Sequence, residues 1–145
     1  NIGGIVHTHS SWATIWAQSG RDITAYGTTH ADYFYGDIPC TRKMKIEEIK
    51  SEYEKETGKL IIETLNERNL SPSNMKGILV HSHGPFVWGE TADDAVHNAV
   101  VLEELAKMAA HTETLNTHVK KMQDELLDKH FFCFYGENAY YGQKK

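Results

Sequence analysis

The sequence has few cysteines and no long apolar run, and each shortage narrows the class of protein. Only two of the 145 residues are cysteine, and Cys40 and Cys133 are far apart in no Cys-x-x-Cys arrangement. We therefore expect two reduced thiols in a cytoplasmic protein rather than a disulfide framework. The apolar runs are only a few residues long, well short of the ~20 residues that span a bilayer, and no signal peptide is visible.

An excess of positive charge is also lacking. The formal net charge is -5, which argues against nucleic acid or an anionic membrane as the main partner but not against a small anionic substrate. The length is that of one domain, residues 1–145. Because the sequence begins at Asn1 with no initiator Met, almost directly on its first motif, we expect a further segment upstream and treat this domain as partial.

Two short histidine pairs are the most informative feature that is present. His7 and His9 flank Thr8, His81 and His83 flank a serine, and each pair follows a short β-branched run. Side chains two apart in a strand point to the same face, so two such strands could present up to four imidazoles to one point. A catalytic zinc keeps one position open. We therefore expect the second pair to supply one metal ligand and one supporting residue.

The pattern of apolar residues predicts alternating strands and helices. Amphipathic spacing predicts helices, β-branched runs predict strands, and Gly84-Pro85 is read as a strand stop. Alternation of this kind favours a three-layer α/β arrangement with parallel strands. The predicted elements are a strand at 3–9, a helical turn at 12–16, a loop with a short strand at 23–34, a helix at 46–68, a strand at 77–83, a helix from N-cap Thr91 to about residue 110 and a helix at 117–131.

Two further groups are candidates for proton transfer. Asp32 is either a general acid or base beside a metal-bound substrate or a loop-capping aspartate, and the residues alone leave both open. Tyr140 and Tyr141 stand in the C-terminal tail. A tyrosine near a cation can donate or accept a proton, and the alternative is packing against a neighbouring subunit.

Several stretches together resemble a known family over nearly the whole chain. These stretches are His7-Thr8-His9-Ser10, residues 27–36 (GTTHADYFYG), residues 38–42 (IPCTR), residues 81–86 (HSHGPF), residues 125–130 (ELLDKH) and residues 138–143 (NAYYGQ). Together they resemble the L-ribulose-5-phosphate 4-epimerase family of the class II aldolase/adducin superfamily.

The resemblance implies a fold and a metal centre. The fold would be a three-layer α/β/α sandwich around a largely antiparallel sheet, which overrides the parallel arrangement favoured by alternation. It would assemble as a C4 homotetramer with active sites between subunits. Zn²⁺, or another divalent ion such as Mn²⁺, would be held by His7, His9 and His83.

The resemblance also implies a reaction and its acid/base groups. L-ribulose 5-phosphate would be converted to D-xylulose 5-phosphate at C4 by retro-aldol cleavage and re-addition through a metal-bound enediolate. Asp32 and Tyr141 would act from opposite sides, with Tyr141 supplied by the adjacent subunit. His130 would be a further residue supplied by a neighbour, and Thr28 would help at the substrate. Which pentulose phosphate is used stays open.

The chain departs from the resembled family at two places, and two other functions stay open. The family's phosphate-binding loop, catalytic lysine and an acid near the metal belong to an N-terminal part, so we expect little activity from this polypeptide alone. Residues 131–135 (FFCFY) stand where the resembled family has a basic stretch, which would remove positive charge near the place where a neighbouring subunit would meet the phosphate. A class II sugar-phosphate aldolase is the nearest rival, and an adducin-like binding module without metal chemistry is the other.

Overall fold

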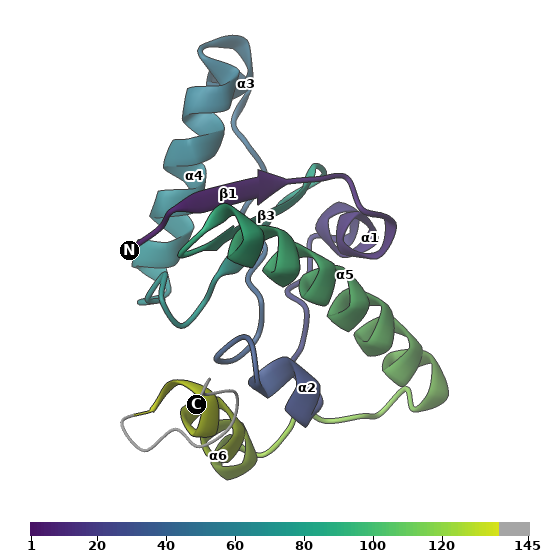
Figure 1. Ribbon diagram of the computed structural model, residues 1–145. Coiled ribbons are helices and arrows are strands. Elements are labelled where there is room, and N and C mark those ends of the chain that lie inside the picture. The colour runs from purple at the N-terminus through teal and green to yellow at the C-terminus, as the bar shows by residue number, and fades with distance from the viewer. Residues whose placement is uncertain (137–145) are drawn as a thin grey trace.

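A small antiparallel sheet lies between helices in the computed structural model, which describes residues 1–136 (Figure 1). Three strands and six helices are defined within those residues. In chain order they are β1 (Gly4–His7), α1 (Ser11–Ser19), α2 (Thr28–Ala31), α3 (Ile46–Lys50), α4 (Tyr53–Glu67), β2 (Gly77–Val80), β3 (Gly84–Gly89), α5 (Ala92–Leu115) and α6 (Asp124–Tyr135).

The sheet is antiparallel throughout, with strand order β1-β3-β2. Its register pairs His7 with Phe86 across β1 and β3, and Val80 with Gly84 across β2 and β3. The parallel arrangement favoured by alternation is therefore wrong, because a hairpin links β2 and β3 and needs no helical crossover. The antiparallel sheet implied by the family resemblance is confirmed.

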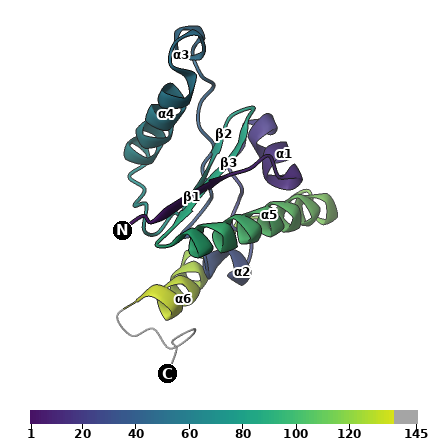
Figure 2. The same cartoon turned by 45° about the horizontal axis from the view of Figure 1, so that its top comes forward.

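Helices cover both faces of the sheet and make three layers (Figures 1 and 2). Strand alternation sends Ile78 and Trp88 to one face, where they pack in a buried cluster with Leu65 of α4. Leu79 and Val87 point to the other face and join the main core, which α1 and α5 complete. The α/β/α sandwich is confirmed, and the antiparallel pairing brings the end of β1 beside the start of β3.

The predicted strand at 77–83 ends early, and a strand that the sequence analysis missed follows it. β2 stops at Val80, and β3 begins at Gly84. Between them His83 N donates to Val80 O over 3.0 Å, and Ser82 adopts a left-handed φ of 61°. Gly84-Pro85 predicts the end of a strand, but the chain turns just before it, and Pro85 is the second residue of β3, close to a strand start where a missing N–H is tolerated.

The predicted helices also change their bounds. The helix expected at 46–68 is two helices, with a break at Ser51 and Glu52. The segment 23–34, read as loop and short strand, contains α2. The helix expected at 117–131 begins at Asp124 instead, because residues 117–118 form a turn and Met122 N donates to Ala25 O rather than to a carbonyl of its own segment.

The start of α5 is where the sequence placed it. Thr91 is the N-cap, its side chain accepts from Asp94 N, and the Asp94 carboxylate returns a bond to Thr91 N. This capping box satisfies two backbone donors at the helix start. Of the helices described, none is both long and apolar enough to cross a bilayer.

Candidate metal centre

Three histidines converge where β1 ends and β3 begins. His7 is the last residue of β1, His9 follows two residues later, and His83 lies in the turn before β3. One ligand nitrogen from each lies within 4.8 Å of the others. The ring centroids are 4.7 to 5.1 Å apart. A strand end and a tight turn therefore bring three imidazoles to one point.

Neighbouring groups orient two of these rings. The His7 Nδ1 atom lies 2.9 Å from Pro85 O, and its ring stacks on Phe86 at 4.1 Å. Since a carbonyl only accepts, Nδ1 must carry the proton, which leaves Nε2 as the free ligand atom. The His83 Nδ1 atom lies 3.3 Å from the Tyr53 hydroxyl. Contacts of this kind fix the tautomer and angle of metal-binding histidines.

The charge state of His83 suits a cation site. Burial lowers the pKa of His83 below its ordinary value, and the neighbouring His7 and His9 lower it further. His83 is therefore neutral at physiological pH, as a metal ligand must be. Three imidazoles with an open side match a catalytic zinc site, in which water or substrate takes the fourth position. His7 and His9 are exposed, so this side is accessible.

His81 does not join the cluster. Its Nδ1 lies 2.7 Å from Ser82 Oγ, and its ring packs over Gly20, where an added Cβ would meet His81 Nε2 at 2.5 Å. The expectation that two residues of one strand share a face fails here because both histidines lie in a turn. One histidine of the second pair, His83, therefore joins the cluster, and a supporting role for His81 stays a prediction.

Asp32 and His130 form a second polar cluster. The His130 Nδ1 atom lies 2.9 Å from Asp32 Oδ1, and this contact joins the end of α2 to α6. In both views α5 passes between the α2–α6 pair and the end of β1 (Figures 1 and 2). Thr28 begins α2, and its carbonyl accepts from Asp32 N. The structure therefore groups Asp32 with His130 rather than with the histidine cluster of the same chain, and Tyr141 lies outside the described residues.

A buried histidine that the sequence analysis did not single out holds the loop after Asp32. His30 is 3% exposed, and its Nε2 donates to the Gly36 carbonyl over 2.7 Å. Gly36 has a φ of +100°, which favours glycine. Burial lowers the pKa of His30 and keeps it neutral. Tyr53 was missed as well, because a tyrosine at helical spacing predicts only a core position.

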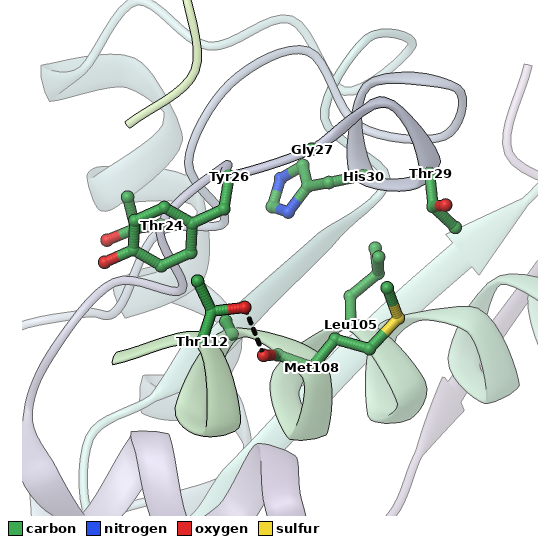
Figure 3. Close-up of a pocket in the computed structure, with 9 residues that line it drawn as sticks. Thr24, Tyr26, Gly27, Thr29, His30, Leu105, Met108 and Thr112 are labelled. Carbon is green, nitrogen blue, oxygen red and sulfur yellow. Dashed lines mark hydrogen bonds between the residues drawn. The ribbon is translucent and has the colours of Figure 1, made fainter. Parts of the chain in front are cut away.

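A separate cavity lies between α5 and the segment leading into α2 (Figure 3). Its volume is about 190 Å³, and it contains neither the histidine cluster nor Asp32. His30 lines it, but that ring is committed to Gly36. The cavity therefore offers no set of metal ligands and no free acid/base pair. Its lining residues are Thr24, Tyr26, Gly27, Thr29, His30, Leu105, Met108, Ala109 and Thr112.

The sandwich and its histidine cluster define the class of protein. The chain belongs to the family described as Class II Aldolase and Adducin N-terminal domain, which matches residues 1–110. It is also 58% identical over 144 residues to the L-ribulose-5-phosphate 4-epimerase UlaF of Salmonella paratyphi C (strain RKS4594) and to that of Salmonella choleraesuis (strain SC-B67). Each match covers 99% of this chain but 62% of the relative's length. The resemblance drawn from the motifs is confirmed.

Solved structures show the same fold at low sequence identity. An L-fuculose 1-phosphate aldolase superposes with a TM-score of 0.68 at 17% identity, covering 90% of this chain and 55% of its own. The L-fuculose 1-phosphate aldolase from Glaciozyma antarctica PI12 gives a TM-score of 0.67 at 18% identity, covering 93% and 45%. The class II aldolase fold is therefore shown for this chain.

Proposed function

We propose that the chain forms a zinc centre and takes part in the C4 epimerisation of L-ribulose 5-phosphate to D-xylulose 5-phosphate. The observation that carries the proposal is the convergence of His7, His9 and His83 within 4.8 Å. Relatives 58% identical over nearly the whole chain are named as L-ribulose-5-phosphate 4-epimerases. Mn²⁺ is the alternative ion, since imidazole ligands alone do not select zinc.

In this proposal the histidine cluster binds a cation, and Asp32 and Tyr141 transfer protons. A divalent cation would supply Lewis-acid chemistry at the substrate's carbonyl and hydroxyl oxygens and stabilise charge left when the C3–C4 bond breaks. Asp32 would take or return the proton of the C4 hydroxyl, with His130 2.9 Å away to hold the carboxylate in place. Inversion needs a second group on the opposite face, and Tyr141 is our candidate. Thr28 would contact the substrate beside Asp32.

The separation of the two clusters within one chain supports an assembly. Since α5 lies between the histidine cluster and the Asp32–His130 pair (Figure 2), one chain does not bring them to one substrate. We therefore propose a homotetramer with active sites between subunits, in which Asp32, His130 and Tyr141 of one copy complement the histidines of another. From the sequence, Asp32 is expected to act in the subunit that holds the metal. In this proposal Asp32 acts instead at the metal of a neighbouring subunit.

A class II sugar-phosphate aldolase is the second candidate, favoured by the fold shared with L-fuculose 1-phosphate aldolases. It would cleave the same kind of bond but release both products. An adducin-like binding module is opposed by the presence of all three converging histidines.

The proposed location and partner follow the sequence analysis. Both cysteines are buried and unpaired, which agrees with the expected cytoplasmic location. The proposed partner is a small sugar phosphate substrate rather than a membrane or a nucleic acid.

The first test concerns the metal. The purified chain should bind one zinc ion per protomer and gain thermal stability from it, because a ligand that binds only the folded state stabilises it. Metal-free protein with no gain on adding zinc would contradict the metal centre and favour the binding module.

The second test concerns the reaction. A chimera in which this chain replaces the matching 144 residues of the Salmonella paratyphi C relative should invert C4 of L-ribulose 5-phosphate. This chain alone should show little activity. Release of free aldehyde without inversion would identify an aldolase instead.

A further inference from the structure

Tyr53 is the first residue of α4, and its side chain reaches the turn that carries His83. Its hydroxyl lies 3.3 Å from His83 Nδ1, and the two rings are stacked with an interplanar angle of 29° and centroids 6.1 Å apart. Tyr53 is only partly exposed. A hydrogen bond and a ring contact therefore act on one imidazole from one side chain.

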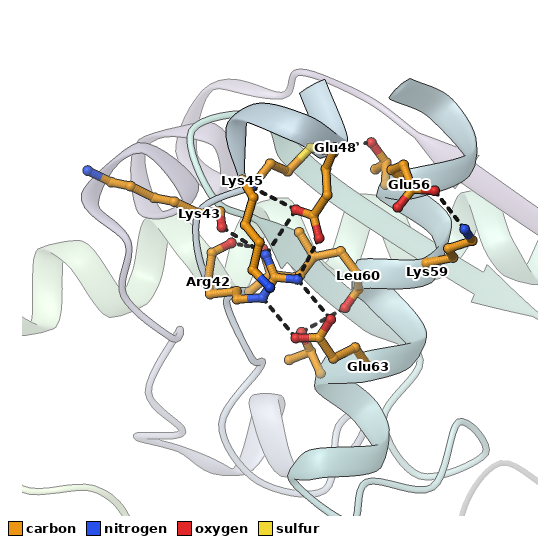
Figure 4. Close-up of polar contacts among 12 residues, drawn as sticks. Arg42, Lys43, Lys45, Glu48, Glu56, Lys59, Leu60 and Glu63 are labelled. Carbon is orange, nitrogen blue, oxygen red and sulfur yellow. Dashed lines mark hydrogen bonds and ion pairs between the residues drawn. The ribbon is translucent and has the colours of Figure 1, made fainter. Parts of the chain in front are cut away.

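The local fold explains why Tyr53 is at this place. The helix break at Ser51 and Glu52 starts α4 afresh at Tyr53. Arg42 fixes the angle between the two helices, since its guanidinium bonds Glu48 of α3 and Glu63 of α4, each through two nitrogens (Figure 4). Bidentate pairs of this kind hold geometry well. Tyr53 is thus presented from a braced helix start rather than from a free loop.

The side of His83 that meets Tyr53 is otherwise a cavity. This cavity has a volume of about 320 Å³ and is lined by Lys43, Met44, Ile49, Tyr53, Val80, His81, Ser82 and His83. The Tyr53 hydroxyl is the hydrogen-bond partner that the structure gives to His83 Nδ1 within residues 1–136. Without it, His83 would keep its ring contacts with His7, His9 and Phe86, but its Nδ1 atom would lose the hydrogen bond that Tyr53 supplies on the side of this cavity.

We propose that Tyr53 is a positioning residue for the metal centre. In the tautomer that leaves His83 Nε2 free for a metal, His83 Nδ1 donates its proton to the Tyr53 oxygen 3.3 Å away. His7 receives the equivalent support from the Pro85 carbonyl. Outer contacts of this type commonly change metal affinity by about 10- to 100-fold when removed. The inference rests on the proposed metal centre and adds one residue, from a different helix, to it.

Tyr53→Phe is the decisive variant, because it removes the hydroxyl and keeps the ring stacked on His83. We expect zinc affinity, measured by competition with a chromophoric chelator, to fall by about 10-fold or more. The visible absorption of Co²⁺ bound in place of zinc should change in position or intensity. The melting temperature of the metal-free protein should stay close to that of the wild type, since the lost bond is partly exposed.

Tyr26→Phe is the matched control, since it removes a tyrosine hydroxyl that is bonded to Glu113 over 2.6 Å and not to any of the three converging histidines. It should leave zinc affinity and the Co²⁺ spectrum unchanged. In a His83→Ala background, Tyr53→Phe should have no further effect on the residual affinity. Normal zinc affinity and an unchanged spectrum in Tyr53→Phe would overturn the role of Tyr53 alone. Absence of zinc binding by the wild type would overturn the metal centre and this role together.

Discussion

The side chains of Asp32 and His130 meet at 2.9 Å although 98 residues separate them in the chain. The contact links the end of a one-turn helix to the middle of α6. An imidazole held by a carboxylate through Nδ1 keeps Nε2 available for a substrate or a second proton. Both members of the pair come from one chain, so the contact does not require a second subunit.

Asp32→Asn should reduce epimerisation in the chimera by about 10²- to 10⁴-fold, the usual contribution of a general acid or base. If Asp32 and Tyr141 act on opposite faces, Asp32→Asn and Tyr141→Phe should damage the two reaction directions unequally. Initial rates measured from each epimer give this ratio.

Asp128→Asn is the control, because this α6 carboxylate bonds Tyr35 rather than the pair. It should retain most of the activity. Wild-type rates in Asp32→Asn would remove Asp32 from the mechanism.

The two histidines of the second pair should behave differently. His83→Ala should abolish the stabilisation by zinc, which for the wild type at a zinc concentration of 100 times the dissociation constant is about 2.7 kcal/mol. His81→Ala should keep it, since that ring packs on Gly20 and Ser82 instead of the cluster. Thermal melts with zinc and with a chelator measure both. Equal loss in the two variants would refute the assignment.

Gly84 lets β1 and the turn approach closely. A Cβ there would lie 2.7 Å from Thr8 O and 3.4 Å from His9 Cδ2, so Gly84→Ala should cost about 1–3 kcal/mol of stability through overpacking and also weaken zinc binding.

Gly58→Ala is the matched control, because a Cβ at this α4 position meets no atom within 4 Å. It should gain up to about 1 kcal/mol in the helix. Denaturant titration compares the two, and a neutral Gly84→Ala would show that the turn can move away.

The Arg42 network should make stability depend on acid pH. Hydrogen bonds from Arg42, and a further one from Lys45 N, lower the pKa of Glu48 from 4.5 to about 2. The resulting stabilisation is present above the ordinary pKa and is lost as the pH falls toward 2. Arg42→Met should therefore be less stable than wild type near neutrality, and the difference should shrink at acid pH.

Urea titrations across that range measure this difference. Lys59→Met, which breaks only the exposed pair with Glu56, should change little. A difference between wild type and Arg42→Met that is constant with pH would mean that packing of the arginine stem, and not its charge, stabilises this region.

The histidine cluster could be predicted from the sequence because strand alternation drew attention to both histidine pairs and the family motifs selected His7, His9 and His83. Their convergence needed only that two segments meet. The turn at residues 81–83 could not be predicted from the sequence. Gly84-Pro85 indicates that the chain changes direction nearby, but not whether the turn lies before or after these two residues. Local pattern fixes the kind of element more firmly than its bounds.

Contacts between segments that are distant in the chain could not be predicted from the sequence for a different reason. Ile46 and Ile49 continue the helical spacing of α4 yet are 65% and 52% exposed, so periodicity predicted one helix where the chain makes two. The approach of Tyr53 to His83 depends on that break, and the Asp32–His130 contact depends on how α6 docks on α2. Neither arrangement has a signature in residue spacing.

His30 gives a test of the loop that carries Asp32. Burial lowers the pKa of His30 from 6.5, and the bond to Gly36 and the charge of Asp37 oppose this only in part. Below pH 6.5 the His30 side chain therefore binds a proton in the unfolded chain but not in the folded chain. The free energy of unfolding falls as the pH decreases, by up to about 1.4 kcal/mol per pH unit for one proton. His30→Gln should reduce this slope between about pH 6.5 and pH 5, measured by urea unfolding with a chelator present. His118→Gln, an exposed residue between α5 and α6, should leave the slope as it is, and an unchanged slope in His30→Gln would show that His30 is protonated in the folded protein.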